Sequence, residues 1–582
     1  MASALAVSPC SKAVTILTGP TFTPATNAAL AGLLKLTTDV DTRVAVSVDE
    51  GTNTWQRDFY DFATEHSVPL LGFKSNRTNE IQVTVYDKYR TSYIASTSLV
   101  FVTAGLPSAF PKYSVLQSDP DRMEPGYTLF MVQVRNGAKN YITIMDNSAN
   151  VVWYRTAPGT YDVDVRQLDN GALFVPSAGN RFVEFNMLGQ TNRVLNAPSG
   201  YPLDLHDVIP TDRGTIVYLS HKTRVVTNFA SSAVSNAPVT TKNIDDMPIV
   251  EISATNGALL NIWSPFDILQ TNRITYLTYE SGDSYGVDNE HANAVLEDPR
   301  DNSFIVSLRN QNSVFKFSRE TGDLRWILCA PANWSEEWQP YLLTPMGEDF
   351  EWNRAQHAPM LSPQGTLFLY DNGNNRASPW DPILANPDNY SRGVEFLIDE
   401  TNMTVTQMWD TVLTNEDRLF TPIIGDADWL PQRENVLVTY GYVTYINGVH
   451  PSSYSANATM VRIKEYTHDA EPEVVFDLSL WDYSNVSSSY LGNFVYRSDR
   501  IPDLYPHPAK PVTSLVVDVT NSTPHLMFSA DPVRSYRLEA SINTVDWTDL
   551  GTVSPAPDTG DYDFVDSDAC QYGARFYRIV TE

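Results

Sequence analysis

Six short segments of the chain repeat one pattern, and this repetition limits the fold more than any other feature of the sequence. Most copies begin with a small or polar turn residue and continue as a run of aliphatic and aromatic residues typical of a strand. The segments are 127–132 (YTLFMV), 171–176 (GALFVP), 214–219 (GTIVYL), 302–307 (NSFIVS), 365–370 (GTLFLY) and 435–440 (NVLVTY). Recurring strands of this kind indicate a propeller or a solenoid.

Two more strand patterns follow most of these segments. The first alternates in polarity, as in 181–186 (RFVEFN), 313–318 (SVFKFS), 392–399 (RGVEFLID) and 460–466 (MVRIKEY). The second often ends in tryptophan, at Trp153, Trp263, Trp326 and Trp409. The unit predicts an antiparallel meander ordered as in a propeller blade, with the tryptophans packed between blades rather than stacked on sugars. The units start about 43 to about 88 residues apart, so insertions separate the blades.

The sequence therefore predicts an all-β protein: a six-bladed β-propeller with an N-terminal β-sandwich and a small C-terminal β-sandwich. The expected parts are a tail (1–11), the N-terminal sandwich (12–108), the propeller as catalytic domain (109–505), a proline-rich linker (506–511) and the C-terminal sandwich (512–582). One short helix is expected over residues 55–65, where Phe59, Phe62 and Ala63 have the spacing i, i+3, i+4.

The charge of the chain limits its partners. Lysine and arginine number 40 against 69 aspartates and glutamates, which gives a net charge of −29. Binding of nucleic acid or anionic lipid needs clustered cations, so both are excluded as expected partners. An anionic substrate would have to be held by a few cations focused in a cleft. No apolar run reaches the roughly 18 residues that a membrane-crossing helix needs, so no membrane insertion is expected.

Cysteine usage and the N-terminus bear on metals and on localisation. Cys10, Cys329 and Cys570 are far apart and belong to no metal-binding pattern, so no structural zinc and no cofactor are expected. The first residues do not have the charged and apolar regions of a signal peptide, so the protein is either cytosolic or shown here without a targeting segment. The acidic surface, rich in Asn, Thr and Ser, and the acidic C-terminal part favour a periplasmic or secreted protein.

Three histidines occupy similar positions ahead of successive repeats. His206, His291 and His357 come 9, 12 and 9 residues before matching strand positions. In a propeller, equivalent positions in successive blades meet at the central axis, so these imidazoles are expected to share a site. Zinc binding by the three histidines remains an alternative. Carboxylates beside them are few, namely Asp207 and Glu290.

Two arginines are candidate anion ligands. Arg309 ends the strand 304–309 of the unit that contains His291, where its side chain would face the axis. A guanidinium beside neutral imidazoles suits a tetrahedral oxyanion, although a surface salt bridge is the alternative. Arg376 is a second candidate for substrate binding, with stabilisation of its loop through Asp371 as the alternative.

The motifs around these residues resemble those of the bacterial, nucleotide-independent arylsulfate sulfotransferases. They occur in the same order and spacing, over roughly residues 12–500: 289–295 (NEHANAV), 305–311 (IVSLRNQ), 321–328 (TGDLRWIL), 356–357 (QH), 369–376 (LYDNGNNR) and 390–400 (YSRGVEFLIDE). The resemblance implies a six-bladed propeller with an N-terminal β-sandwich, a homodimer in many members, and a catalytic histidine that is transiently sulfurylated.

By this resemblance His357 is the nucleophile, His206, His291 and Arg309 surround the transferred sulfuryl group, and Asn293 is a supporting hydrogen-bond donor. The implied reaction is ping-pong transfer from a small aryl sulfate donor to a phenol, without a nucleotide; the sequence has no glycine-rich phosphate loop to bind one. One departure is that Cys329 has no neighbouring partner for the disulfide that enterobacterial members carry near the catalytic loop.

Two other function classes remain open at this point. A propeller lyase or hydrolase could use the same histidine and arginine pocket on an anionic glycan. A non-catalytic binding scaffold would use the histidines only for packing. The three classes differ in their products, because only transfer leaves a sulfuryl group on an acceptor phenol and only a lyase forms an unsaturated sugar.

Overall fold

The protein was analysed as a computed structural model. It describes residues 14–51, 53–86, 93–134, 139–280, 282, 284–411, 418–453, 455–481, 491–505, 516–520, 523–529, 536–553, 561–572 and 574–581. The tail (1–11) and the linker (506–511) lie outside the described residues. The helices in the described part are single turns, α1 (Pro265–Ile268) and the 3-10 turns η1 (Gln339–Tyr341), η2 (Asn386–Asp388) and η3 (Ala569–Gln571). The all-β class is confirmed.

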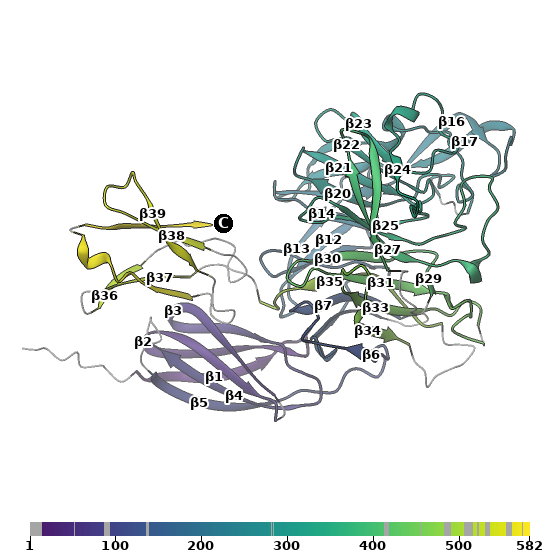
Figure 1. Cartoon of the computed structure of the whole chain (residues 1–582). Helices are drawn as coiled ribbons and strands as arrows, with labels where there is room; N and C mark the ends of the chain where they lie inside the picture. The colour runs from purple at the N-terminus through teal and green to yellow at the C-terminus, as the bar shows by residue number, and fades with distance from the viewer. Residues whose placement is uncertain are drawn as a thin grey trace, which may run out of the picture.

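The N-terminal region is one five-stranded sheet built on two long strands. The strands are β1 (Ile16–Pro24), β2 (Ala31–Asp49), β3 (Thr54–Leu71), β4 (Thr78–Tyr86) and β5 (Tyr93–Val102). β3 pairs with both halves of β2, whereas β1 pairs with the first half of β2 and β4 with the second. The apolar face of this sheet shares a buried core with β7 (Tyr127–Val134) and β34 (Val474–Leu480) of the propeller. The sheet lies below the propeller in Figure 1.

The helix predicted over residues 55–65 is wrong, because this segment is the first part of β3. Pairing with β2 satisfies its backbone hydrogen bonds; Phe59, for example, lies opposite Val44. The apolar residues that suggested a helical face do not share one. Phe59 packs against the N-terminal core, while Phe62 is 41% exposed. Long-range strand pairing has overridden a weak local period.

The propeller is a ring of sheets. Each sheet has four or five strands, and the sheets follow one another along the chain. The first sheet contains β10 (Arg166–Gln167), β11 (Leu173–Ser177), β12 (Arg181–Phe185) and β13 (Thr191–Asn196). The second contains β14 (Leu203–Pro210), β15 (Thr215–Ser220), β18 (Ile249–Ser253) and β19 (Leu259–Trp263). The third contains β20 (Ala292–Asp298), β21 (Ser303–Leu308), β22 (Ser313–Ser318) and β23 (Leu324–Leu328). Each is an antiparallel meander, with one insertion between β15 and β18.

The next sheet contains β25 (His357–Leu361), β26 (Leu367–Asp371), β27 (Arg392–Asp399), β28 (Thr404–Asp410) and, parallel to β28, the short β24 (Thr344–Met346). The last two sheets close the ring with early strands. They are β30 (Asp426–Leu430), β31 (Asn435–Val443), β33 (Met460–Tyr466), β34 and β6 (Ser114–Ser118); and β35 (Asn493–Ile501), β7, β8 (Asn140–Met145) and β9 (Val151–Thr156). Pairing of late with early strands joins the two ends of the ring.

All six repeats found in the sequence are second strands of these sheets, namely β7, β11, β15, β21, β26 and β31. The strand before each repeat lies innermost, since β14, β20, β25, β30 and β35 contact one another in that order. Side chains at the ends of these first strands therefore meet near the axis of the ring. This arrangement is the geometric basis of the candidate site.

The four tryptophans pack between sheets, as predicted. Each lies on a fourth strand and donates its ring N–H to the following sheet or the loop beside it. The acceptors are the Met187 carbonyl for Trp153, the Arg319 carbonyl for Trp263, Oε1 of Glu400 for Trp326 and the Asp469 carbonyl for Trp409. Buried indole rings with satisfied N–H groups stabilise the contacts between neighbouring sheets.

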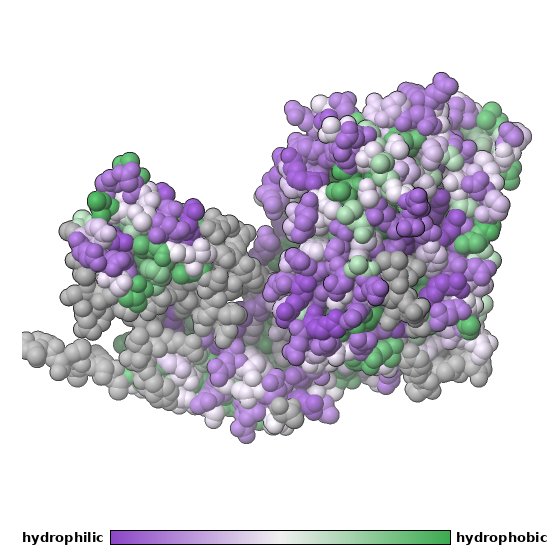
Figure 2. All heavy atoms as spheres, in the orientation of Figure 1, coloured by the Kyte–Doolittle hydropathy of each residue, from purple (hydrophilic) through white to green (hydrophobic). Residues whose placement is uncertain are grey.

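Smaller elements complete the chain. The hairpin β16 (Lys222–Ala230) and β17 (Val239–Asp246) projects from the second of these sheets, and β29 (Leu419–Phe420) pairs with β32 (Tyr445–Ile446). The C-terminal part has two three-stranded sheets around one small core: β36 (Val516–Thr520), β37 (Thr523–Ser529) and β40 (Asp561–Val565); and β39 (Thr548–Val553), β38 (Tyr536–Ser541) and β41 (Phe576–Thr581). The face of the propeller seen in Figure 2 is largely hydrophilic. Within the described residues, no helix is long and apolar enough to span a membrane.

Candidate active site

Three histidines from successive sheets gather around the ring of Tyr496. His206 lies in β14, His291 directly precedes β20, and His357 begins β25. The rings of His206 and His291 are 4.9 Å apart between centroids, in an edge-to-face arrangement. Tyr496, in β35, has its ring 5.9 Å from that of His206 and 6.3 Å from that of His357. The structure thus brings together the three histidines that the sequence singled out, close to the axis of the ring.

His206 and His291 each face a carboxylate through Nδ1. Nδ1 of His206 is 2.6 Å from Oδ1 of Asp204, and Nδ1 of His291 is 2.5 Å from Oδ2 of Asp288. Because a carboxylate only accepts, Nδ1 carries the proton in both rings.

The proton affinities of these two histidines differ. Burial lowers the pKa of His206, but the charge and hydrogen bond of Asp204 outweigh this effect and raise the pKa above its ordinary value. Burial also lowers the pKa of His291, and there it prevails over Asp288, with help from the charges of His206 and Arg309. His206 is therefore the better proton donor of the pair at neutral pH.

His357 has a different environment, without a carboxylate partner. Its Nδ1 lies 2.7 Å from Oδ1 of Asn372. The amide nitrogen of Asn372 donates to the carbonyls of Thr421 and Ile424, at 2.8 and 2.7 Å, so its oxygen must face the imidazole and accept from it. The backbone N–H of Ile424 donates to Nε2 of His357 at 3.2 Å. Nε2 therefore carries a lone pair.

The electrostatics of His357 keep this ring neutral. Its side chain is buried, with 1% exposed. Burial, followed by the positive charge of Arg309, lowers the pKa of His357 well below its ordinary value. A neutral imidazole with a fixed tautomer and a lone pair on Nε2 has the properties of a nucleophile.

Backbone strain is concentrated around these rings. His291, Ala358 and Ile424 have φ values of 48°, 49° and 55°, in the left-handed region that non-glycine residues seldom adopt. Ile424 is β-branched, which makes its conformation the most unfavourable of the three. Each such residue costs about 1–3 kcal/mol and persists where the surrounding structure fixes it, most often at functional sites.

Arg309 supplies the positive charge. Its backbone N–H donates to the carbonyl of His291, which places the side chain beside the histidines. Nη1 contacts Glu280 and Asn310, at 3.1 and 2.7 Å, and Nη2 donates to the carbonyl of Pro422 at 3.1 Å. Nε is buried without a hydrogen-bond partner among the described residues. An orphaned, buried guanidinium donor is suited to an anion that completes the site.

Asn293 lies beside the segment that holds His357. It is fully buried, and its Nδ2 donates to the carbonyl of Gln356 at 2.8 Å, directly before His357. Its backbone carbonyl accepts a hydrogen bond from the Tyr496 hydroxyl at 3.1 Å. These contacts connect Asn293 with the segment that holds the nucleophile candidate.

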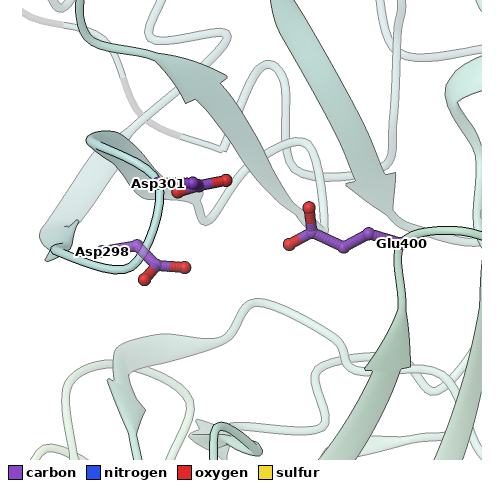
Figure 3. A group of neighbouring side chains, drawn as sticks. All are labelled: Asp298, Asp301 and Glu400. Atoms are coloured by element: carbon purple, nitrogen blue, oxygen red, sulfur yellow. The ribbon is translucent and has the colours of Figure 1, made fainter.

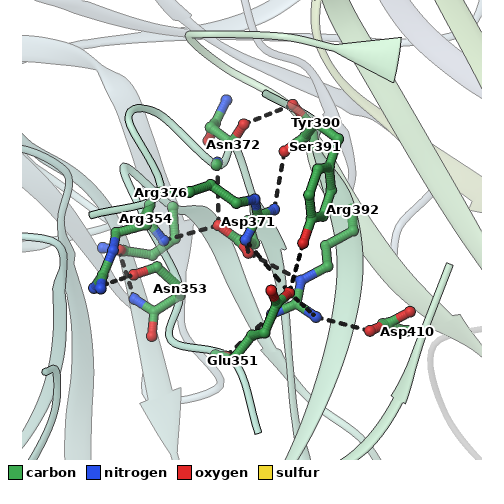
Figure 4. Close-up of polar contacts among 12 residues, drawn as sticks. Glu351, Asn353, Arg354, Asp371, Asn372, Arg376, Tyr390, Ser391, Arg392 and Asp410 are labelled. Carbon is green, nitrogen blue, oxygen red and sulfur yellow. Dashed lines mark hydrogen bonds and ion pairs between the residues drawn. The ribbon is translucent and has the colours of Figure 1, made fainter. Parts of the chain in front are cut away.

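Arg376 lies in a different network, shown in Figure 4. Its guanidinium contacts Asp371 at 3.0 Å and the carbonyl of Tyr390 at 2.9 Å, and it lies over the Tyr390 ring. Arg392 binds the same oxygen of Asp371. No described contact joins Arg376 to the histidines. Its contacts with Asp371 and Tyr390 fit stabilisation of the loop, and substrate binding by Arg376 stays a prediction.

Acidic clusters elsewhere in the ring are candidate metal sites. Among the described residues, two groups bring three possible ligand atoms within 4.8 Å of one another: Asp298, Asp301 and Glu400, and Asp426, Asp428 and Asp499. Neither contains a histidine, so the geometry gives the zinc alternative no support. The carboxylates of the first group face one centre (Figure 3), where Nζ of Lys316 lies 2.7–2.8 Å from all three.

The second acidic group lines a cavity of about 310 Å³ at the inner ends of β30 and β35. Burial raises the pKa of Asp426 to about 7 and that of Asp499 to about 6. The charges of Arg166 and Arg497 act in the opposite direction on both groups.

Comparison with known sequences decides the family. The sequence model described as "Arylsulfotransferase (ASST)" matches residues 112–490, which is more than half of the chain. The chain belongs to the arylsulfotransferase family. Two relatives of this family are the arylsulfate sulfotransferases AssT of Escherichia coli O6:H1 strain CFT073, 25% identical over 352 residues, and of Lelliottia amnigena, 24% identical over 351 residues. Each match covers 52% of this chain and 56% of the relative, so the chain spans about half the length of these arylsulfotransferases.

Solved structures with some likeness to this chain include the periplasmic gluconolactonase PpgL of Pseudomonas aeruginosa and a streptogramin B lyase. PpgL gives a TM-score of 0.30 at 13% identity, over 78% of this chain and 99% of PpgL. The lyase gives 0.29 at 12% identity, over 62% of this chain and 86% of the lyase. TM-scores this low carry no argument about function.

Proposed function

We propose that this protein transfers a sulfuryl group from an aryl sulfate ester to a phenol by a ping-pong reaction, with His357 as the group that is transiently sulfurylated. The observation that carries the proposal is the contrast among the three imidazoles. His357 has a neutral amide on Nδ1, whereas His206 and His291 have carboxylates there. This contrast separates a nucleophile from proton donors, and family membership supports the same chemistry.

In the first half-reaction, Nε2 of His357 attacks sulfur in line with the departing oxygen. An N–S bond forms while the S–O bond to the aryl group breaks, and the electron pair leaves with the phenolate. His206, as imidazolium, donates its Nε2 proton to that oxygen, a step worth typically ~10²–10⁴-fold. A sulfurylated His357 and a free phenol result, so atoms and charge balance.

The transferred group carries its charge on the non-bridging oxygens in a loose transition state, as in phosphoryl transfer. Arg309 is suited to stabilise these oxygens because its Nε is an unused buried donor. The N–H of Ile424 lies on Nε2 of His357 in the free protein. This N–H would be beside the sulfuryl oxygens once Nε2 has bonded to sulfur.

In the second half-reaction, a phenol takes the place of the first product. His206, now neutral at Nε2, accepts the phenolic proton, and the phenolate oxygen attacks sulfur to release His357. The predicted partners are thus a small aryl sulfate donor and a phenolic acceptor. Glu280, which contacts Arg309 and is about half exposed, would move aside when a sulfate ester binds.

The test is release of nitrophenolate from 4-nitrophenyl sulfate, with and without added phenol, at constant protein concentration. Release that depends on phenol, with phenyl sulfate as product, supports transfer. Acceptor-independent release would overturn it in favour of a hydrolase, and no release with any aryl sulfate would overturn it in favour of a scaffold or a lyase. His357→Ala should abolish turnover, whereas His468→Ala, at a partly exposed histidine paired with Glu395, is the matched control.

A further inference from the structure

A fourth histidine lies behind His206 and shares its carboxylate. His221 follows β15, at the base of the β16–β17 hairpin. Its Nε2 is 2.8 Å from Oδ2 of Asp204, and its Nδ1 is 2.7 Å from Oδ2 of Asp245. Its ring stacks on Tyr285, with centroids 4.9 Å apart and planes 6° apart. Both ring nitrogens therefore face carboxylates.

The contacts form a continuous chain from the hairpin to the site: Asp245, His221, Asp204, His206. Asp204 and Asp245 are buried, with 6% and 1% exposed. Asp204 uses one oxygen for His206, which it contacts through both Nδ1 and the backbone N–H, and the other for His221. Two imidazoles thus share one buried carboxylate, each through a different oxygen.

The geometry of Asp245, His221, Asp204 and His206 sets their charges. Burial lowers the pKa of His221, but hydrogen bonds to Asp204 and Asp245 outweigh it and raise the pKa of His221 to about 10. His221 is therefore a cation at neutral pH. Burial opposes ionisation of Asp204, yet the two histidines hold its pKa below the usual range. The cationic His221 in turn lowers the proton affinity of His206.

We propose that His221 is a positioning residue of the transfer reaction: by sharing Asp204 it holds that carboxylate ionised and oriented, and it limits how tightly His206 retains the proton that passes to and from the phenol. This inference rests on the proposed function. A proton donor that is too weak an acid transfers poorly, so an acid shared in this way is matched to its task.

Other groups also act on His206. From its own strand these are Asp204 and Asp207; from the elements packed against it they are His221, Asp288, His291, Arg309, His357 and Tyr496. Among them, His221 is joined to the proposed proton donor through a common carboxylate. Its removal therefore changes the charge behind His206 and leaves the groups that would touch the substrate in position.

The test uses His221→Gln in the full chain, since glutamine can still donate a hydrogen bond to Asp204 but carries no charge. Selective labelling of histidine and NMR titration follow the His206 ring, with its signal assigned by its loss in His206→Gln. The pKa of His206 is expected to rise in His221→Gln. With phenyl sulfate as donor, the alkaline limb of kcat/KM should move to higher pH, and kcat/KM at neutral pH should fall about tenfold, less than the ~10²–10⁴-fold contribution of a whole acid.

Two further variants keep the test decisive. Asp245→Asn removes one of the two carboxylates that hold the charge of His221 without changing Asp204, so it should also shift the His206 titration. Tyr285→Leu removes the stacked ring but keeps both ion pairs, so the titration should stay in place. An unchanged His206 titration in both His221→Gln and Asp245→Asn would overturn the inference. Because the titration needs no turnover, it decides the coupling even where the transfer assay has failed and the proposed function has been abandoned.

Discussion

The tautomer of His357 is the most specific claim that a single substitution can test. Asn372→Leu keeps the approximate volume of the side chain and removes three hydrogen bonds, those to His357 Nδ1 and to the carbonyls of Thr421 and Ile424. Nδ1–H would then keep only the longer contact with the carbonyl of Ala355, at 3.1 Å, or its proton would move to Nε2, where it would meet the N–H of Ile424. Both outcomes remove the lone pair from a fixed position on Nε2.

The magnitude follows from these contacts. A buried donor left unsatisfied costs about 1–3 kcal/mol, which corresponds to about 5- to 150-fold in kcat/KM. The two carbonyls that lose their donor each cost a similar amount, and this loss should appear as a lower free energy of unfolding. Activity and stability are thus expected to fall together, and they must be measured separately.

The assay is phenol-dependent turnover of 4-nitrophenyl sulfate, normalised to the folded fraction from urea unfolding. Asn374→Ala is the matched control, because Asn374 lies in the same loop, is buried, and makes no described contact with His357. Asn372→Leu with kcat/KM within about threefold of the parent protein would refute the claim that Asn372 holds His357 in its reactive tautomer.

Three other predictions follow from the same geometry. Arg309→Lys should lower kcat/KM by about 10²–10³-fold in the same assay, because an ammonium cannot reproduce the guanidinium fork; near-normal turnover would remove Arg309 from the mechanism. Glu280→Gln should lower the KM for the donor by up to about fivefold, since an exposed ion pair with Arg309 is worth about 0–1 kcal/mol; an increased KM would mean that Glu280 helps binding instead. The stabilising effect of His221 should be fully present below about pH 6.5 and be lost as the pH rises towards about 10, because its pKa is raised in the folded protein; urea midpoints of the parent and His221→Gln should converge over that range, and a constant difference would contradict the assigned charge.

The fold could be predicted from the sequence where local pattern decides it. The six repeats could be predicted as strands because a turn followed by an apolar run is recognisable within a few residues. Closure of the ring could not be found in this way. It depends on pairing of β35 with β7 and of β34 with β6, which brings together segments more than 350 residues apart. The same long-range pairing turned the helix expected over residues 55–65 into a strand.

Part of the candidate site could also be predicted from the sequence. The common offset of His206, His291 and His357 indicated that their rings meet, because equivalent positions in successive sheets face one axis. Asp204 and Asp288 lie two and three residues before their histidines, so the sequence contains a local signal for these partners.

Asn372 and Ile424 gave no such signal. Asn372 reaches His357 from 15 residues away, and its orientation is fixed by carbonyls of Thr421 and Ile424 about 50 residues further along the chain. Tyr496 comes from the strand that closes the ring. Arg376 was ambiguous in sequence because an arginine near Asp371 suits both an anion site and a loop, and the described contacts favour the loop.

The central claim is that Nε2 of His357 bonds to sulfur. The most direct measurement is mass spectrometry of the intact protein, and then of its peptides, after mixing with 4-nitrophenyl sulfate in the absence of phenol. We predict one added sulfuryl group per chain, located on His357, formed together with one equivalent of nitrophenolate and lost when phenol is added. A turning-over protein without this adduct, or with the adduct on another residue, would contradict the account.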